Sequence, residues 1–423
     1  MQVAGIIAEY NPFHNGHQYH IEQTKSQLAG CDGIIAVMSG NFTQRGEPAI
    51  FDKWTRTKAA LHGGADLVLE LPTAFATRSA GYFARGGVLT LAATGVVSHL
   101  SCGVEDTANA DTASQLMHIA DLLANEPPQY QSLIQTFTHQ GMAYPAARQK
   151  ALQQMQIPGA QLLDTPNNIL ALEYLQTIQQ EHLSITPMLI PRRGNYHADS
   201  VPNANGNAAK EYEQQFASAT AIRKLILAED SLWQTQMPEA SAQTLAQHIA
   251  DGYTPMEAEA FAQYLLFLLR RSTPEDWSNI VEMIEGLENR IYEMAHRQEI
   301  QTIAELCMAV KSKRYTYTRI MRTLLYILLH FTEQYSAQEP AYLRVLGFND
   351  TGQKMLKEMK KKASLPILIR PARQRNELTA KGQQLLELDI RATNLYDTAY
   401  HNPALRQINA DLLRTPIQVS YII

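Results

Sequence analysis

Short apolar runs alternate with amphipathic stretches along the first half of the chain. The apolar runs are of strand length and fall at residues 3–8, 33–38, 66–71, 97–103 and 183–190. The intervening patterns are typical of helices and cover residues 16–28, 52–64, a stretch from about residue 80, 167–180 and 218–229. Strands that alternate with helices predict βαβ units. We therefore expect an α/β fold with a doubly wound parallel sheet.

The alternation ends near residue 232. Beyond it, long helical patterns occupy residues 256–271, 275–297 and 316–332. A chain of 423 residues exceeds what one hydrophobic core usually organises. We expect an α/β domain at residues 1–231 and a mainly α-helical domain at residues 232–423. Within the first domain, residues 111–150 look like a helical insertion that covers the sheet, and residues 192–207 form a loop rich in Gly, Asn and Pro.

Composition narrows the class of protein. The formal net charge of −5 excludes a chain that is basic throughout, so any nucleic-acid surface must be local. No basic and apolar leader opens the sequence and no apolar stretch is long enough for a membrane span, so we expect a soluble, cytosolic protein. Cys31, Cys102 and Cys307 are widely spaced, which favours buried, reduced thiols over disulfides or a zinc site.

The segment "AEYNPFHNGHQYH" follows the first predicted strand. A strand that turns tightly into a helix presents backbone N–H groups and the positive end of the helix dipole, which suit a phosphate. His14 and His17 are three residues apart and can face one phosphate, while Gly16 lets the backbone approach it. Two alternatives remain: the histidines cap the helix or face water, or they bind a metal with His20, although this spacing does not match zinc sites.

A second signal lies at the end of the same predicted domain, in "FASATAIRK". Ser218 or Thr220 can cap a helix whose first turn carries Arg223, and this geometry offers hydroxyls, N–H groups and a guanidinium to a polyphosphate. An ordinary capped helix is the alternative. The pairing with HxGH makes the polyphosphate interpretation specific.

Together these motifs resemble a known family. HxGH followed late in the domain by a Ser/Thr-rich turn and Ile-Arg resembles the nucleotidyltransferase branch of the HIGH superfamily, which has a Rossmann-like fold. The motifs "EYNPFHNGHQYH", "MSGNFTQRGEPAIFDKWTRTKAAL", "GADLVLELP", "TPNNILALEYL" and "SATAIRK" are similar, in this order, to the tRNA(Met) cytidine acetate ligase family. The second motif has SAT where many members of the superfamily have ISST.

The resemblance implies a two-step reaction. Acetate attacks ATP to give acetyl-adenylate and pyrophosphate, and N4 of the wobble cytidine of elongator tRNA(Met) then takes the acetyl group and releases AMP. The resemblance also implies that His14 and His17 are catalytic, because they would stabilise charge on the α-phosphate. Mg²⁺ is the expected companion of ATP, although no carboxylate cluster marks a metal site.

The resemblance extends to the residues that would contact ATP. In the opening loop these are Ile7, Ala8, Glu9, Tyr10, Asn11, Pro12, Phe13, His14, Asn15, Gly16, His17, Gln18, Tyr19 and His20. Farther along the chain they are Gly103, Asn167, Asn168, Arg192, Arg193, Ser218, Thr220 and Arg223. Asn167 has a competing role as a helix cap.

The loop at residues 38–48 follows the second predicted strand and should open at the same edge of the sheet. Its residues Gly40, Asn41, Gln44 and Arg45 can bind acetate or the target cytosine, or can simply face solvent. Lys53 and Arg56 lie one helical turn apart and either contact tRNA phosphate or face water.

Two basic clusters lie in the predicted helical domain. The tRNA-binding residues we expect there are Lys311, Lys313, Arg314, Arg319, Arg322, Lys360, Lys361 and Lys362. In the helix at 316–332, Ile320, Leu324, Ile327 and Phe331 form an apolar stripe from which the arginines stand apart. A solvated charged face is the alternative.

Two other functions compete with the ligase. One is a small-molecule adenylyltransferase that transfers AMP to a phosphorylated metabolite, and the other is a non-catalytic RNA-binding protein. The basic clusters argue against the first, and the pair of phosphate motifs argues against the second. The oligomeric state cannot be read from these patterns.

Overall fold

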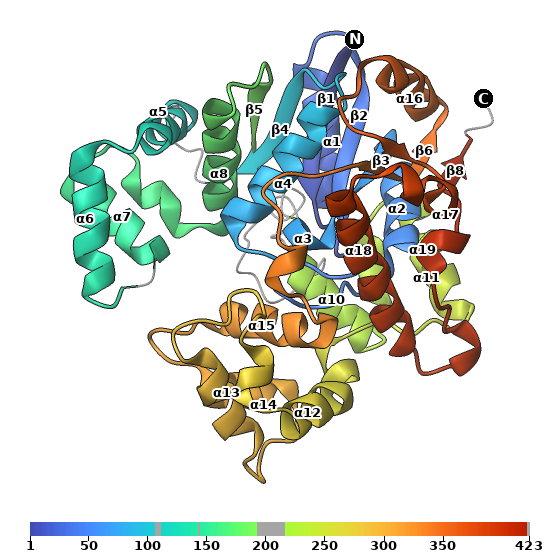
Figure 1. Ribbon diagram of the computed structural model, residues 1–423. Helices are drawn as coiled ribbons and strands as arrows, with labels where there is room; N and C mark the ends of the chain where they lie inside the picture. Colours follow the sequence, from blue (N-terminus) through green and yellow to red (C-terminus); the bar gives the residue numbers. More distant parts are fainter. Residues whose placement is uncertain (106–110, 143, 193–215, 421–423) are drawn as a thin grey trace, which may run out of the picture.

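The computed structural model describes residues 1–105, 111–142, 144–192 and 216–420. Its centre is one eight-stranded sheet in the order β5-β4-β1-β2-β3-β6-β7, with β8 paired to β6 (Figure 1). The strands are β1 (Gln2–Ala8), β2 (Cys31–Ser39), β3 (Leu67–Leu71), β4 (His99–Val104), β5 (Thr186–Pro191), β6 (Leu343–Asn349), β7 (Ile367–Leu368) and β8 (Ile417–Val419).

The first five strands are those that the apolar runs predicted. They pair in parallel, with β1 between β2 and β4, so the predicted α/β class is confirmed. The helices that follow them are α1 (Asn15–Gln27), α2 (Lys53–His62), α3 (Thr73–Ala76), α4 (Ala80–Ala93), α8 (Pro166–Gln180) and α10 (Ala219–Leu227). Asp52 caps α2 by accepting hydrogen bonds from the N–H groups of Trp54 and Thr55.

Helices cover the sheet on both faces, and alternate strand residues divide between two cores. In β2, Ile35 and Val37 pack with residues of α4 and α8, whereas Ile34 and Ala36 pack with residues of α1 and α2. Strands buried on both faces are apolar throughout, which is why they appeared in the sequence as continuous apolar runs.

The second half of the chain differs most from expectation. It returns to the sheet through β6, which pairs antiparallel with β3, and through β7 and β8, none of which was predicted. β7 and β8 have only two and three residues, and β6 carries Arg344 in its interior and is followed directly by α16 (Asp350–Lys362), so no uninterrupted apolar run marks them. The division of the chain near residue 232 stays a prediction.

Helices of this half form a lobe below the sheet and a layer beside it (Figure 1). They are α11 (Glu239–Ala250), α12 (Ala262–Arg271), α13 (Leu287–Ala295), α14 (Ile303–Val310), α15 (Tyr317–Leu329), α17 (Pro371–Gln374), α18 (Ala380–Thr398) and α19 (Ala410–Leu413). The prediction of one helix at 275–297 was wrong. Glu282, Glu285 and Gly286 have positive φ angles, which stop a helix between the short 3₁₀ turn Pro274–Trp277 and α13.

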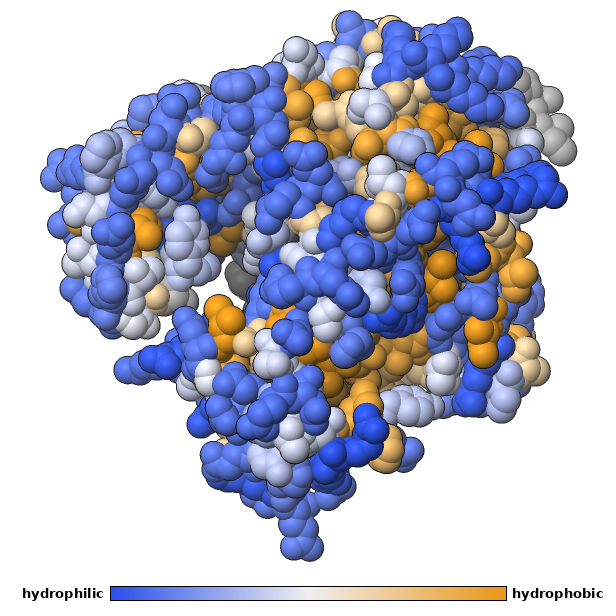
Figure 2. Space-filling model, viewed as in Figure 1, coloured by the Kyte–Doolittle hydropathy of each residue, from blue (hydrophilic) through white to orange (hydrophobic). Residues whose placement is uncertain are grey.

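The segment at 111–150 contains α5 (Thr112–Asn125), α6 (Pro128–His139) and most of α7 (Tyr144–Gln154). It was expected to cover the sheet, but α5 packs mainly on α8, and α6 and α7 extend away from the strands (Figure 1). The surface is hollowed between this segment and the lobe of α12–α15 (Figure 2). Among the described helices, none combines the length and apolar character needed to cross a membrane.

Candidate active site

A pocket opens where β1, β4 and β5 end. Its walls come from these strand ends, the loop at residues 43–47, the first turn of α1, the start of α8 and the first turn of α10. Of the predicted ATP-binding residues, the pocket is lined by Ile7, Ala8, Glu9, Tyr10, Asn11, His14, Gly16, His17, Tyr19, His20, Gly103, Asn167, Arg192, Ser218, Thr220 and Arg223. Segments far apart in the sequence therefore meet in one pocket, as predicted.

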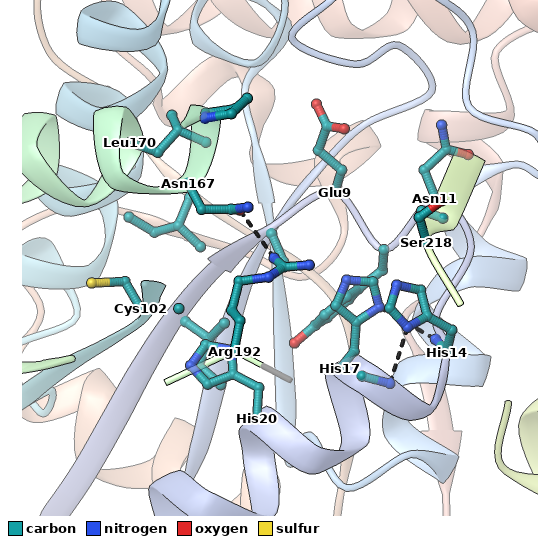
Figure 3. A pocket seen from close by; sticks show the side chains of 18 of the residues that line it. Glu9, Asn11, His14, His17, His20, Cys102, Asn167, Leu170, Arg192 and Ser218 are labelled. Atoms are coloured by element: carbon teal, nitrogen blue, oxygen red, sulfur yellow. Dashed lines mark hydrogen bonds between the residues drawn. The ribbon is translucent and has the colours of Figure 1, made fainter. Parts of the chain in front are cut away.

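His14 and His17 line the pocket and also cap α1. The N–H of Gly16 donates to Nδ1 of His14 at 3.0 Å, and the N–H of His14 donates to Nδ1 of His17 at 3.3 Å. The two imidazole centroids are 3.8 Å apart (Figure 3). The capping alternative is thus realised together with the pocket position. Because each Nδ1 accepts a hydrogen bond, each neutral ring carries its proton on Nε2 and can donate it.

Burial and neighbouring cations keep these rings neutral. Desolvation lowers the pKa of His14 to about 3, and Arg192 and Arg223 add to this effect. The pKa of His17 is likewise lowered well below its ordinary value, chiefly by burial and by His14. A phosphate in the pocket would reverse part of the desolvation cost, because an adjacent anion favours the protonated imidazole. The site is therefore electropositive through its arginines and contributes imidazole N–H donors.

Helix α10 brings the second motif to the wall beside the HxGH loop. Ser218 is its N-cap and accepts from the N–H of Ala221 at 3.1 Å. Arg223 donates to the carbonyl of Asn11 at 2.9 Å and to the hydroxyl of Thr220 at 3.2 Å. These bonds join α10 to the loop before HxGH and hold the guanidinium at the pocket.

The ends of β4 and β5 and the start of α8 form a third wall. Arg192 donates to the side-chain oxygen of Asn167 at 3.0 Å (Figure 3). Asn167 also contacts Glu105. A side chain at Gly103 would crowd Arg192, since an added Cβ would lie 3.0 Å from its Cγ. Asn168 is fully buried and bonds the backbone of Glu105, so it supports this wall without lining the pocket.

Several residues of the opening loop lie outside the pocket. Pro12, Phe13, Asn15 and Gln18 do not line it; Phe13 is fully buried, and the side chain of Asn15 donates to the carbonyl of Thr235. Asn167 does not cap α8, because Thr165 holds that position. Arg193 lies outside the described residues.

The sequence did not single out the apolar part of the wall. Phe83, Cys102, Leu170, Tyr174 and Phe216 line the pocket together with Thr43 and Glu47. Apolar residues in strands and helices carry no local signal that separates a pocket from a core. Only the packing of α4 and α8 beside the strand ends reveals them.

Lys53 and Arg56 do not face solvent or a nucleic acid, so both interpretations of these residues were wrong. Each is fully buried. Arg56 donates to the carbonyl of Glu9 at 2.6 Å and to that of Ser39 at 3.1 Å, and it also contacts the carbonyl of Gly40. This one guanidinium holds the ends of β1 and β2 in position beside the pocket.

Lys53 lies in a buried charge cluster. Its Nζ is 2.6 Å from Glu70 Oε1 and 2.7 Å from Asp411 Oδ1, and Arg344 is 3.4 Å from Asp411. The opposite charges offset the cost of burying the ammonium group. The C-terminal part of the chain is therefore tied to α2 and β3 of the N-terminal half.

The predicted tRNA-binding residues fall into two groups. Arg319 pairs with Glu285, Arg322 pairs with Glu282, and Lys361 pairs with Glu358. Lys311, Lys313 and Arg314 are exposed in the segment that leads into α15. Lys360 and Lys362 are exposed at the end of α16, in a different part of the fold.

The metal alternative for the histidines finds no support. In the part of the chain that the structure describes, no group of three or more His, Cys, Asp or Glu side chains is arranged to hold a metal ion. His20 instead hydrogen-bonds to Ser101 at 2.8 Å. Cys102 and Cys307 are buried and Cys31 is half-buried, and all three are free thiols.

A parallel sheet whose first strand turns into a histidine-capped helix, with an arginine brought back from a late helix, defines a nucleotidyl transferase site. The sequence model of the HIGH Nucleotidyl Transferase family matches residues 1–411. The chain belongs to this family and, within it, to the tRNA(Met) cytidine acetate ligases, because its relatives match over nearly their whole length.

Two of these relatives are named tRNA(Met) cytidine acetate ligase. The protein of a Thermoanaerobacter species is 39% identical over 96% of this chain and 97% of its own. That of Syntrophomonas wolfei is 39% identical over 99% of both chains. Thermotoga maritima TmcAL has a TM-score of 0.90 in its apo form and 0.87 bound with alpha-thio ATP, at 33% identity and full coverage of both chains.

Proposed function

We propose that this chain is an ATP-dependent ligase that acetylates N4 of the wobble cytidine of elongator tRNA(Met). It would first join acetate to AMP, with release of pyrophosphate, and then transfer the acetyl group to the tRNA with release of AMP. Acetate is a poor acyl donor because its leaving group would be oxide, and the mixed anhydride with AMP supplies a good one.

The observation that carries this proposal is the meeting of HxGH and SATAIR in one pocket. Arg223 of the second motif donates to the backbone of Asn11, three residues before His14 of the first. The Nε2–H groups of His14 and His17 would donate to the α-phosphate as acetate attacks it, and charge develops there in the transition state. Arg223, Arg192 and Thr220 would hold the remaining phosphates.

Mg²⁺ would bind together with ATP. It would neutralise charge on the phosphates. The described residues offer no cluster of carboxylates or histidines as a dedicated site. Hydrogen bonds from the histidines and arginines of the pocket would therefore stabilise the charge that develops on the phosphates.

The tRNA would approach from the side of the lobe of α12–α15. Lys311, Lys313 and Arg314 are exposed in the segment directly before α15, and phosphate contacts to them would weaken as salt rises. Lys360 and Lys362 are proposed as a second contact on α16. Arg319, Arg322 and Lys361 would contribute only after exchange of their glutamate partners for phosphate.

Nucleoside analysis of tRNA tests the proposal. The purified protein is incubated with ATP, labelled acetate and elongator tRNA(Met), and the digested tRNA is separated into nucleosides. We expect label in N4-acetylcytidine, with none when ATP or acetate is omitted. Label that stays in a small phosphorylated metabolite, or AMP transferred to such a metabolite, would instead support the adenylyltransferase alternative.

A further inference from the structure

The pocket contains a carboxylate that polyphosphate binding does not require. Glu9 follows β1 directly, and its side chain points away from the imidazoles of His14 and His17 (Figure 3). A carboxylate beside the phosphates of ATP would repel them. Its position in the pocket therefore calls for a function other than phosphate binding, although Glu9 belongs to the stretch expected to contact ATP.

The side chain of Glu9 is oriented through one of its two carboxylate oxygens. The N–H of Gln44 donates to Oε1 of Glu9 at 2.8 Å, and no described residue donates a hydrogen bond to its Oε2. The backbone carbonyl of Glu9 is fixed by Arg56 at 2.6 Å. One oxygen is thus oriented by the protein and the other is available to a substrate.

The loop that orients Glu9 lies against the helical lobe. Within it, the N–H of Thr43 donates to the carbonyl of Glu47 at 2.9 Å and that of Gly46 to the carbonyl of Thr43 at 2.9 Å. Gly46 has φ 79° and lies so close to α15 that an added Cβ would be 2.6 Å from the N atom of Arg322. The Glu9 end of the pocket is therefore the end nearest the lobe through which the tRNA is proposed to approach.

His14 and His17 cannot act as bases in their present arrangement. Nδ1 of His14 and Nδ1 of His17 each accept a backbone N–H, so Nε2 carries the proton. His20 bonds through Nε2 to Ser101, and burial together with Arg192 lowers its pKa to about 4, so its imidazole is a weak proton acceptor. Among the described residues that line the pocket, Glu9 and Glu47 carry the carboxylates and are the candidate bases.

We propose that the Glu9 carboxylate takes the proton from the cytidine N4 amine as that amine attacks acetyl-adenylate. This inference rests on the proposed function. The N4 lone pair forms the new bond to the acetyl carbon, the bond from that carbon to the phosphate oxygen breaks, and AMP leaves with its electron pair. The N4 proton moves to Oε2 of Glu9 and is later released to water.

The raised pKa of the Glu9 carboxyl group suits its role as a base. Burial raises its pKa above the ordinary value, against the hydrogen bond from Gln44 and the charges of Arg223 and Arg45. A carboxylate whose pKa is shifted towards neutrality accepts a proton more readily than an exposed one.

The test separates activation from transfer. Glu9→Gln removes the base and keeps an oxygen that can accept from Gln44. Acetohydroxamate formation from ATP, acetate and hydroxylamine reports activation alone, and single-turnover acetylation of tRNA(Met) reports transfer. We expect transfer to be at least about 100-fold slower, as for loss of a general base, and hydroxamate formation to fall by a much smaller factor. The wild-type transfer rate should rise with pH to a plateau, and the variant should lose this rise.

Other outcomes would overturn the inference. Equal loss of hydroxamate and transfer in Glu9→Gln would make Glu9 part of the ATP site, and unchanged transfer would exclude it as the base. Glu47→Gln is the matched comparison, and loss of transfer in that variant alone would assign the proton to Glu47. Wild-type protein that forms hydroxamate but never acetylates tRNA would refute the proposed function itself. The wild-type measurement alone therefore tests the proposed function, and the variants test the role of Glu9.

Discussion

At the scale of single residues, His14 serves two purposes at once. Its Nδ1 caps α1 by accepting from the N–H of Gly16, and the same bond leaves the proton on Nε2, where the pocket needs a donor. A helix cap and a phosphate ligand are therefore not competing interpretations of HxGH. The local bond that begins the helix also sets the tautomer for binding.

The two purposes can be separated with His14→Asn. Asn is a good N-cap and can still accept from Gly16, but it removes the imidazole from the pocket. We expect a melting temperature within a few degrees of wild type and a loss of about 100-fold or more in acetate-dependent exchange of pyrophosphate into ATP. His14→Ala is the comparison and should also lose about 1 kcal/mol of stability with the cap. Full exchange activity in His14→Asn would contradict the phosphate role.

The same variant tests the pH dependence of stability. The pKa of His14 is lowered to about 3 by burial, while the unfolded chain titrates near 6.5. Between these values the unfolded state binds more protons, so the stability that the neutral ring contributes is complete above about pH 6.5 and is lost as the pH falls towards about 3.

Urea unfolding of wild type and His14→Asn at several pH values measures this. The stability of wild type relative to the variant should fall as the solution is acidified, by up to about 1.4 kcal/mol for each pH unit within that window. A difference between the two proteins that does not change between pH 7 and pH 5 would show that the buried ring is not held neutral.

At the scale of elements, α15 shows how a basic helix differs from a basic surface. Its stripe Ile320, Leu324 and Ile327 is buried as the 3.6-residue pattern predicted. The arginines beside the stripe face the loop that carries Glu282 and Glu285. The period of a helix tells which side is buried, but it does not tell which acidic loop packs on the other side.

Exposed cations before α15 are therefore the stronger candidates for tRNA contact. The variant with Lys311, Lys313 and Arg314 all changed to Gln should bind tRNA(Met) more weakly, and the slope of log affinity against log salt should decrease by about 2 to 3. Filter binding across a salt series measures both quantities. Arg319→Gln is the control, and it should change the slope less because its charge is already balanced by Glu285. An unchanged slope in the triple variant would place the tRNA elsewhere.

At the scale of the whole molecule, the C-terminal half completes the sheet and closes a buried charge cluster. Lys53 and Glu70 come from α2 and β3, whereas Arg344 and Asp411 come from β6 and α19. Removal of one partner from such a cluster leaves an uncompensated buried charge. Loss of one charge of this cluster should therefore destabilise both halves of the chain in a single unfolding transition.

Asp411→Ala tests this connection. It leaves Lys53 with Glu70 as its remaining carboxylate within ion-pair distance. We expect a loss of about 3–5 kcal/mol in the free energy of unfolding, measured by urea denaturation. Asp251→Ala, at an exposed position at the end of α11, is the matched control and should change stability by less than about 0.5 kcal/mol. A small effect of Asp411→Ala would mean that water or other charges replace the carboxylate.

The sequence by itself determined the parallel core and the two phosphate motifs. Continuous apolar runs become strands covered on both faces, and the HxGH turn and the SATAIR cap are local arrangements that neighbouring residues fix. His14, His17 and Arg223 could be named for this reason. Their positions relative to the strand ends follow from the rule that ligands bind at the carboxyl edge of a parallel sheet.

Only the tertiary structure decided the rest. Lys53 and Arg56 look like surface cations in the sequence, but long-range contacts with Asp411 and with the backbone of Glu9 bury them. β6 forms because β3 offers an edge, and β7 and β8 pair with β6 in turn. The Glu282 and Glu285 pairs depend on a loop far from α15 in the sequence. Periodicity reports which residues are apolar, whereas the partner of a buried charge or an edge strand is set by segments that meet only in the folded chain.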